Sequence, residues 1–295
     1  MALMPFDDRD GSIWINGEMI PWREATSHTL SHGLHYASTV FEGERVYSGV
    51  IFKGREHTER LRQSCEMLDF ELPLSDDELD AAKMAVVEAN GIVDGYVRAF
   101  AWRGSEMMAI SAQHTTTHVA IAAWEWPSYF DPETKMKGIT LDIADWKRPS
   151  PESAPVHAKA AGLYMICTLS KHAAEKKGFQ DALMLDYRGY LAEATGANVF
   201  FVDKEGTIHT PIADCFLDGI TRRTVIALAE SLQMKVVQRH LTLDDLSEMT
   251  ECFLTGTAAE VTPVSQIGDA SFTPGDISRQ LVDGYENLVR GRIAL

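Results

Sequence analysis

The stretch Pro155-Val156-His157-Ala158-Lys159-Ala160-Ala161-Gly162 places a single lysine among small residues, directly before an apolar segment that we predict to be helical over residues 163–177. A lysine that is withdrawn from water has a lowered pKa, because burial disfavours its charged form. Such a lysine is a nucleophile that can form a Schiff base with an aldehyde. Taken alone, the stretch also fits an ordinary exposed lysine in a loop.

Two later stretches have the character of anion sites. Residues 217–223 bring Gly219 to the start of a predicted helix at Ile220 and Thr221, where free amides and the helix dipole favour a phosphate. Residues 254–260 end a predicted strand in a turn of small and hydroxyl residues that can form a second anion site. A plain helix junction and a simple tight turn remain the alternatives.

A fourth stretch, residues 190–198, holds Glu193 between small residues at the end of a predicted strand. A carboxylate there can hold a cationic ring nitrogen, although a solvated turn acid has the same sequence pattern. The histidines His28, His32 and His35 invite a metal site, but few cysteines or carboxylates accompany them. We therefore expect core or turn histidines and no metal.

The rest of the chain is organised in two halves around these stretches. A length of 295 residues suggests two domains, and the breaker-rich residues 127–133 mark their boundary. We expect a small N-terminal α/β domain over residues 1–127, a linker over 128–137 and a large C-terminal domain over 138–295. Helices and strands are mixed in both halves, so the predicted fold class is mixed α+β and α/β. The main predicted elements are a hairpin at 12–22, helices at 55–68, 76–90, 220–232 and 277–289, and strands at 95–102, 118–126, 139–146, 182–186, 198–202 and 207–210. Asn16-Gly17 predicts the hairpin turn, residues 75–78 form a capping box that opens the second helix, and the apolar positions of the first helix include Leu61 and Cys65.

Composition excludes several classes of protein. With 27 Lys and Arg against 43 Asp and Glu, the net charge of −16 disfavours binding to nucleic acid. The sequence holds no run of about 18 apolar residues that would predict a membrane span, and its first residues do not resemble a signal peptide. No Cys-x-x-Cys pair occurs, so we expect reduced thiols in a cytoplasmic protein. The cysteines are Cys65, Cys167, Cys215 and Cys252.

Together these stretches resemble one family: the pyridoxal-phosphate enzymes of fold type IV and, within it, the branched-chain amino acid aminotransferases. The resemblance runs from about Ile13 to Val289. It implies two α/β domains with pyridoxal 5′-phosphate in the interdomain cleft, and a homo-oligomer that is at least a dimer and possibly a hexamer. The residues that carry it are 31–36, 40–43, 55–57 with 60–61, 96–98, 158–160, 193–200, 219–222 and 256–264.

The resemblance also implies roles for individual residues. Lys159 is similar to the Schiff-base lysine that also moves the proton, Glu193 to the acid facing the pyridine nitrogen, and Tyr164 to the phenol near the ring oxygen. Leu217 would pack on the ring. The expected phosphate contacts are Arg55, Ile220, Thr221 and Thr257, with Gly219 and Gly256 beside them. The expected substrate residues are Tyr36, Phe41, Gly43, Arg45, Tyr96, Arg98, Met107, Trp126, Tyr129 and Ala258.

The implied reaction moves an amino group between L-leucine, L-isoleucine or L-valine and 2-oxoglutarate by a ping-pong mechanism. The alternatives are a D-amino acid or (R)-amine aminotransferase of the same fold, an aminodeoxychorismate lyase, and a non-catalytic protein that binds pyridoxal phosphate. The chain departs from the family pattern at Ala99, at Leu163 and at Glu44, which replaces a usually apolar residue. These departures bear on the substrate range.

Overall fold

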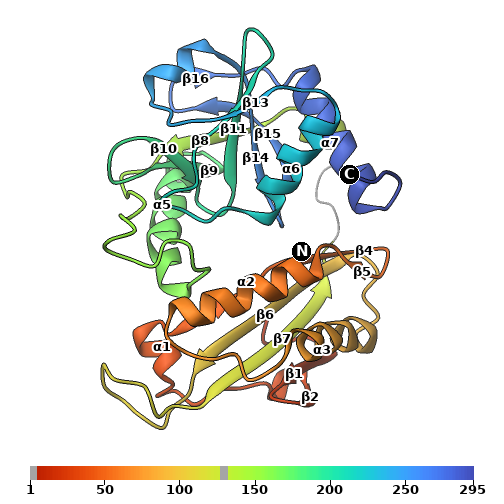
Figure 1. The fold of residues 1–295 in the computed structure, drawn as a ribbon, viewed down its shortest axis with the longest axis vertical. Helices are drawn as coiled ribbons and strands as arrows, with labels where there is room; N and C mark the ends of the chain where they lie inside the picture. Colours follow the sequence, from red (N-terminus) through yellow and green to blue (C-terminus); the bar gives the residue numbers. More distant parts are fainter. Residues whose placement is uncertain (1–4, 127–131) are drawn as a thin grey trace. The chain divides into compact units, whose positions relative to one another are not determined.

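The computed structural model describes residues 5–126 and 132–295. The chain forms two compact units, Met1–Pro127 with Ala158–Gly162, and Ser128–His157 with Leu163–Leu295 (Figure 1). The predicted mixture of helices and strands in two domains is confirmed. The lysine-bearing segment Ala158–Gly162 groups with the first unit although both of its flanks belong to the second, which the sequence pattern did not indicate.

The first unit is built on a seven-stranded antiparallel sheet in the order β2-β1-β7-β6-β4-β5, with β3 paired to β6, among the described residues. The predicted hairpin is present, and Asn16 and Gly17 have φ values of 51° and 104°, as its tight turn requires. The strands are β1 (Ser12–Ile15), β2 (Glu18–Pro21), β3 (Thr39–Phe41), β4 (Glu44–Tyr47), β5 (Val50–Ile51), β6 (Gly95–Arg103) and β7 (Thr117–Glu125).

Three α-helices accompany this sheet: α1 (His32–Tyr36), α2 (Gly54–Met67) and α3 (Asp76–Ala89), with a short 3₁₀ turn η1 (Trp22–Glu24). The start of α3 follows the predicted capping box, since the Ser75 hydroxyl accepts from the amide of Glu78 and the Glu78 carboxylate accepts from the amide of Ser75 at 2.8 Å. The apolar positions of α2 include Leu61 and Cys65, which are buried as predicted.

The second unit contains a nine-stranded mixed sheet in the order β10-β9-β8-β15-β14-β11-β12-β13, with β16 paired to β15, within the described ranges. An additional pairing of β10 with β11 closes six of these strands into a barrel. The strands are β8 (Ile139–Ile143), β9 (Asp181–Leu185), β10 (Leu191–Ala194), β11 (Asn198–Asp203), β12 (Ile208–Thr210), β13 (Val236–Gln238), β14 (Met249–Gly256), β15 (Glu260–Ile267) and β16 (Ala270–Ser271).

The helices of the second unit connect these strands. They are α4 (Pro132–Lys135), α5 (Tyr164–Lys176), α6 (Ile220–Ser231) and α7 (Asp276–Val289), with the 3₁₀ turns η2 (Ala161–Leu163) and η3 (Asp244–Glu248). Residues 128–131 of the predicted linker lie outside the described residues, and its described remainder contains α4. No helix of the described part is long and apolar enough to span a membrane.

Apolar side chains from neighbouring strands form the core of the second unit. Leu141, Leu183, Phe201, Cys252 and Val264 come from five different strands and are fully buried in one cluster. Each such side chain contributes about 1.5–3 kcal/mol relative to an exposed position. The barrel edge that carries the candidate site is therefore attached to a rigid, well-packed support.

Candidate functional site

Glu193 lies in β10, at a tight hairpin that pairs it directly with Asn198 of β11. One carboxylate oxygen lies 3.2 Å from Nε of Arg148, and the other accepts a hydrogen bond from Nδ2 of Asn198 at 3.3 Å. The side chains of Arg148 and Glu193 are 5% and 12% exposed. The Glu193 carboxylate is thus held in place at the barrel edge by a guanidinium and a carboxamide.

Asn198 connects this acid to the start of α6. Its Nδ2 also donates to the carbonyl oxygen of Leu217 at 3.0 Å, and its Oδ1 accepts from the amide of Gly219 at 3.2 Å. A Cβ atom on Gly219 would overlap the Asn198 carboxamide oxygen, so only glycine allows this contact. Asn198 has no predicted role, and its one signal in the sequence is a polar residue opening an otherwise apolar strand.

The N-terminus of α6 retains the amides that an anion needs. The N-cap residue is Gly219, which has no side chain to cap the helix. Ile220 and Thr221 are buried in the first turn. The first amides of an α-helix have no partner within the helix, and the helix dipole is positive there. The predicted helix start at Ile220 is confirmed, and its geometry suits a phosphate.

The second predicted anion turn lies beside the Glu193 hairpin. β14 ends at Gly256, and Thr257 and Ala258 follow before β15 begins. A Cβ atom on Gly256 would lie 3.3 Å from the Cβ of Ala197, which shows how closely the two turns approach. The hydroxyl of Thr255 is buried without a hydrogen-bond partner in the part of the chain that the structure describes. A bound phosphate or its water would satisfy such a group.

Tyr164 and Leu217 complete the second unit's candidates. Tyr164 opens α5 and packs against the buried Ala144, Cys167 and Met184 region. Leu217 is partly buried, and it directly follows Phe216 in the segment that leads to the N-cap of α6. Both therefore lie on the elements that meet around Arg148 and Asn198, since Arg148 also donates to the carbonyl oxygen of Leu163 at 3.4 Å.

Lys159 is held by its backbone in the first unit. Its amide donates to the hydroxyl of Ser64 at 3.0 Å, its carbonyl accepts from the amide of Phe41 at 3.1 Å, and Ala160 forms a bridge with Val40. Ala158 and Ala160 are buried, so the small neighbours noted in the sequence allow this close approach. Lys159 is partly buried rather than fully exposed, and its Nζ lies 5.0 Å from the centre of the Phe41 ring.

Several predicted substrate residues surround the same ring. The guanidinium of Arg98 lies 4.5 Å from the Phe41 ring centre and donates to the Tyr96 hydroxyl at 3.4 Å. Nε of Arg98 is buried without an acceptor among the described residues, which suits a carboxylate ligand. A Cβ atom on Gly43 would overlap the Tyr96 hydroxyl, so the glycine is what makes room for it.

The other predicted substrate residues are placed more loosely. Tyr96 packs on Trp126 with ring centres 5.5 Å apart, and Arg45 donates to the Trp126 carbonyl at 3.2 Å. Tyr36 is exposed and stacks on His32. Met107 is partly buried in the β6–β7 loop of the first unit, and Ala258 is exposed in the second unit. Tyr129 lies outside the described residues.

Arg55 lies in the first turn of α2. Its guanidinium pairs with Asp77, lies 3.0 Å from Asp80 and 3.7 Å from Asp76, all on or at the start of α3. These carboxylates hold the guanidinium against α3, and the phosphate role of Arg55 stays a prediction.

The three histidines are bound to the protein itself. Nδ1 of His32 pairs with the Ser38 hydroxyl at 2.8 Å and Nε2 with the Ala109 carbonyl at 2.9 Å. His35 pairs with the carbonyl of Thr29, and His28 accepts from the amide of Leu30. Their ring nitrogens fix turns of the first unit.

Comparison with known proteins reveals extensive similarity. A family model described as amino-transferase class IV matches residues 39–267. The chain is 42% identical over 294 residues to the probable branched-chain-amino-acid aminotransferase of Rickettsia conorii, covering 98% of this chain and 100% of that one. It is 38% identical over 296 residues to the branched-chain-amino-acid aminotransferase of Pseudomonas aeruginosa, covering 98% and 96%.

Solved structures give the same result. The T.th. branched-chain amino acid aminotransferase with pyridoxamine 5′-phosphate is similar with a TM-score of 0.93 and 38% identity, covering 97% of this chain and 96% of that one. The branched-chain amino acid aminotransferase from Escherichia coli is similar with a TM-score of 0.90 and 33% identity, covering 97% and 96%.

Proposed function

The chain belongs to the class IV aminotransferases, among the branched-chain-amino-acid aminotransferases, and we propose that it transfers an amino group between L-leucine, L-isoleucine or L-valine and 2-oxoglutarate. The fold-type IV prediction is confirmed. The observation that carries the proposal is the role of Asn198, which joins the Glu193 carboxylate to the N-terminus of α6. An acid for a ring nitrogen and amides for a phosphate are thus fixed on one support.

The cofactor is pyridoxal 5′-phosphate, which when bound supplies the electron sink for the electron pair released at the substrate Cα. The α6 amides and Thr257 would hold the phosphate, and Leu217 would pack on the ring. The Glu193 carboxylate would pair with the ring nitrogen, and the hydroxyl of Tyr164 would bind the ring oxygen. Lys159 would carry the cofactor at Nζ in the resting enzyme and, once free, would move the proton at Cα as general base and acid.

The substrate residues suit two kinds of side chain in turn. Phe41, Met107 and Trp126 offer apolar surface to a branched aliphatic chain. Arg98 offers a guanidinium with an unsatisfied Nε, among the described residues, to a carboxylate, and Tyr36 and Arg45 add polar groups for the acidic partner. A site of this composition accepts leucine and 2-oxoglutarate alternately, which gives ping-pong kinetics.

A substrate panel tests the proposal. Purified protein loaded with cofactor is assayed with L-leucine, L-isoleucine, L-valine, D-alanine and (R)-1-phenylethylamine, each against 2-oxoglutarate. We expect turnover of the three branched L-amino acids only. Turnover confined to D-alanine and the amine would contradict the proposal, as would release of pyruvate from aminodeoxychorismate without any oxo acid.

We also infer a cytoplasmic homo-oligomer that is at least a dimer, with a hexamer as the larger assembly. The compartment is supported by the four cysteines, which are all buried free thiols and need no oxidising environment. The assembly is supported by the resemblance to the family and by exposed apolar side chains of the first unit, such as Leu30, Leu34 and Ile110. Light scattering on the purified protein distinguishes a monomer from these assemblies.

A further inference from the structure

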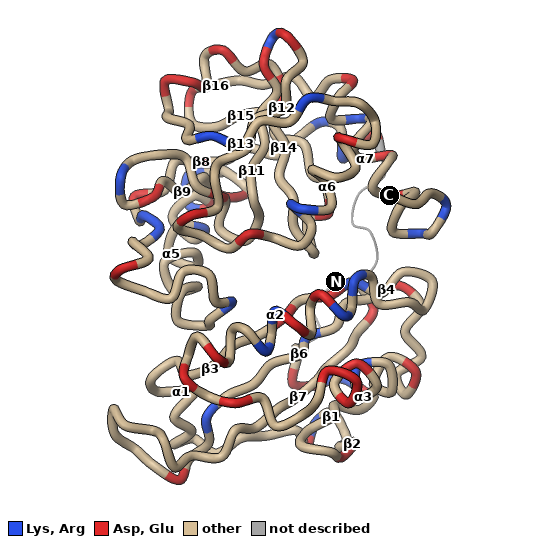
Figure 2. The backbone as a smooth tube through the Cα atoms, in the orientation of Figure 1, with Lys and Arg blue, Asp and Glu red and all other residues tan. Residues whose placement is uncertain are grey.

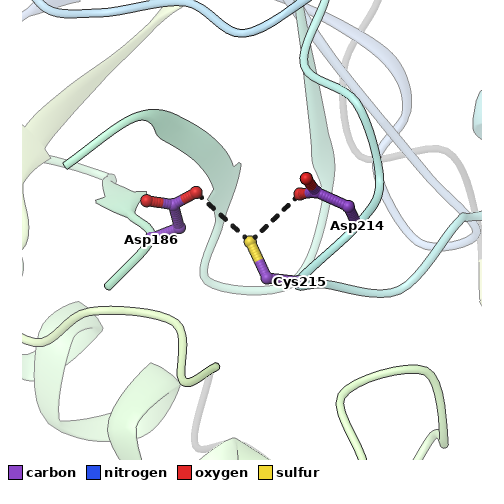
Figure 3. A group of neighbouring side chains, drawn as sticks. All are labelled: Asp186, Asp214 and Cys215. Carbon is purple, nitrogen blue, oxygen red and sulfur yellow. Dashed lines mark hydrogen bonds between the residues drawn. The ribbon is translucent and has the colours of Figure 1, made fainter. Parts of the chain in front are cut away.

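A compact polar cluster, none of whose residues has been assigned a role above, lies in the second unit. It consists of Asp186, Arg188, Asp214 and Cys215, and we call it the Arg188 cluster. Figure 3 shows the thiol of Cys215 between the two carboxylates, with Sγ 3.3 Å from an oxygen of Asp186 and 3.4 Å from one of Asp214. Asp186 and Cys215 are each 1% exposed.

The spacing of the thiol and the two carboxylates resembles a cation site, but Arg188 already fills that role. Its guanidinium donates to Asp186 at 2.7 and 3.0 Å and to both oxygens of Asp214 at 2.8 and 2.9 Å. Burial raises the pKa of the Cys215 thiol, and the two carboxylates raise it further, so the sulfur keeps its proton. The carboxylates are therefore satisfied by a guanidinium and a thiol, and a metal ion would have to displace both.

The cluster joins two segments that are distant in the sequence. Asp186 and Arg188 belong to the turn between β9 and β10, where Asp186 accepts from the amides of Arg188 and Tyr190 at 2.8 and 3.1 Å. Asp214 and Cys215 belong to the segment between β12 and α6. Arg188 ties this segment to the β9–β10 turn through Asp214, and the Cys215 thiol adds a second bond through Asp186.

Both segments lead directly to the proposed cofactor groups. Cys215 and Phe216 pack on Ala192 of β10, the residue before Glu193. Phe216 in turn precedes Leu217, whose carbonyl is bound by Asn198. The Arg188 cluster thus lies behind the ring-nitrogen acid and behind the start of α6 at the same time.

We propose that Arg188 is a positioning residue for the cofactor. Arg188 holds residues 212–219 against β10, so that the α6 amides and Glu193 keep a fixed separation. The inference rests on the proposed function, because it takes the α6 N-terminus as the phosphate site. A planar guanidinium bridges two carboxylates with a fixed, directional geometry, whereas a lysine ammonium acts as a point charge on a flexible stem. A displacement of about 1 Å in such a support is enough to change binding or rate by about a hundredfold.

The test compares variants by their preference for phosphate. Holoenzyme is prepared for wild type, Arg188→Leu, Arg188→Lys and Asp214→Asn, and dissociation constants are measured for pyridoxal 5′-phosphate and for phosphate-free pyridoxal. We expect Arg188→Leu and Asp214→Asn to lower the preference for the phosphate form by about tenfold, with Arg188→Lys between them and wild type. In Arg188→Leu and Asp214→Asn, the phosphorus NMR signal of the bound cofactor should be shifted and broadened relative to wild type. The matched control is Arg279→Leu, at an exposed position of α7. This variant should change neither the preference for the phosphate form nor the phosphorus signal.

The outcomes separate the inference from the function on which it rests. If wild type itself shows no preference for pyridoxal 5′-phosphate over pyridoxal, the phosphate assignment of α6 is wrong. If wild type shows the preference and both Arg188→Leu and Asp214→Asn keep it with an unchanged phosphorus signal, the positioning role is wrong. Asp214→Asn retains the shape of its side chain, so it decides the question even where Arg188→Leu lowers the yield of folded protein.

Discussion

Glu193 shows how single residues acquire their function from contacts that come from distant parts of the chain. Its carboxylate lies between the guanidinium of Arg148 and the carboxamide of Asn198, so its charge is compensated from one side and its orientation is fixed from the other. A carboxylate held in this way is placed to pair with a protonated ring nitrogen.

Replacing Glu193 by glutamine tests that role. Glu193→Gln keeps the shape of the side chain but removes the charge that favours a protonated ring nitrogen. We expect the cofactor still to attach at Lys159, while removal of the Cα proton slows by about a hundredfold or more. The rate is measured in a single half-reaction with L-leucine and with its α-deuterated form. An unchanged rate would be incompatible with the proposed role.

Glu44 and Lys83 form a buried ion pair in the first unit, and their contacts determine what each contributes to stability. Nζ of Lys83 lies 2.9 Å from Glu44 and 3.1 Å from Asp80, and the side chains of Glu44 and Lys83 are each 1% exposed. One oxygen of Glu44 is buried without a hydrogen bond among the described residues, and burial raises the pKa of this carboxyl. The pair is thus costly to break but has no evident catalytic duty.

The two halves of this pair should behave non-additively. Lys83→Met leaves Glu44 buried without its cation, and we expect it to lower the free energy of unfolding by about 3–5 kcal/mol. The double variant Glu44→Leu with Lys83→Met should be within about 1 kcal/mol of wild type or more stable. Denaturant unfolding measures both. The control Lys204→Met breaks an exposed pair with Glu248 and should cost less than about 1 kcal/mol. Additive losses in the double variant would refute this interpretation.

These residues also mark how far sequence reasoning reaches. Lys159, Glu193 and Gly219 stand in local patterns that predict their chemistry, and Glu44 is visible as a charged residue at a usually apolar position. Asn198 and Arg188 carry no such pattern, because their importance lies in bonds to segments about 20 residues or more away. The contacts of Arg55 with three aspartates of α3 are equally hidden in the sequence, because those aspartates lie about 20 residues further along the chain.

Among the helices and strands, signals confined to a few residues are the reliable ones. The Asn16-Gly17 turn and the capping box at Ser75 form as predicted, since each depends on neighbours in the sequence. The helix at Ile220 also begins where its glycine indicates. The sequence does not predict the short strands β3 and β4 or the helix α1, because three to five residues carry little periodicity and their pairing partners are remote.

The start of α6 gives a prediction with a matched control. Gly219→Ala would place a Cβ against the Asn198 carboxamide and loosen its bonds to Leu217 and Glu193. We expect the affinity for pyridoxal 5′-phosphate to fall by about tenfold. Gly196→Ala is the control, since a Cβ there meets no atom within 4 Å among the described residues. Titration of the apoenzyme with cofactor measures both, and equal affinities for the two variants would count against the assignment of α6.

Across the chain as a whole, the net charge of −16 does not prevent an anion from binding. Figure 2 shows acidic residues along both units rather than gathered in one place. A phosphate responds mainly to the amides and hydroxyls within a few ångströms, since salt screens the more distant charges. Acidic composition therefore argues against nucleic acid as a partner while remaining compatible with a phosphate cofactor.

The stability of the molecule should depend on pH through Glu42. This carboxylate is fully buried and bonded to His57 at 2.6 Å and to Arg60 at 2.7 and 2.8 Å. Burial opposes its ionisation, but Arg60 and His57 outweigh burial and hold its pKa well below the ordinary 4.5. A lowered pKa stabilises the fold above about pH 4.5, and that contribution is lost as the pH falls further. The free energy of unfolding of wild type should therefore decrease as the pH falls below about 4.5. The decrease should be less steep in Glu42→Gln, and identical pH profiles for the two proteins would contradict the argument.

Every role proposed for the site depends on Lys159 carrying pyridoxal 5′-phosphate. Borohydride reduces the carbon–nitrogen double bond between a lysine and the cofactor to a stable secondary amine, so the attachment site can be read by peptide mass spectrometry. We predict yellow protein whose reduced cofactor is found on the peptide containing Lys159, and no labelling in Lys159→Ala. Labelling of a different lysine, or wild-type protein that takes up no cofactor on incubation, would show that the assignment is wrong.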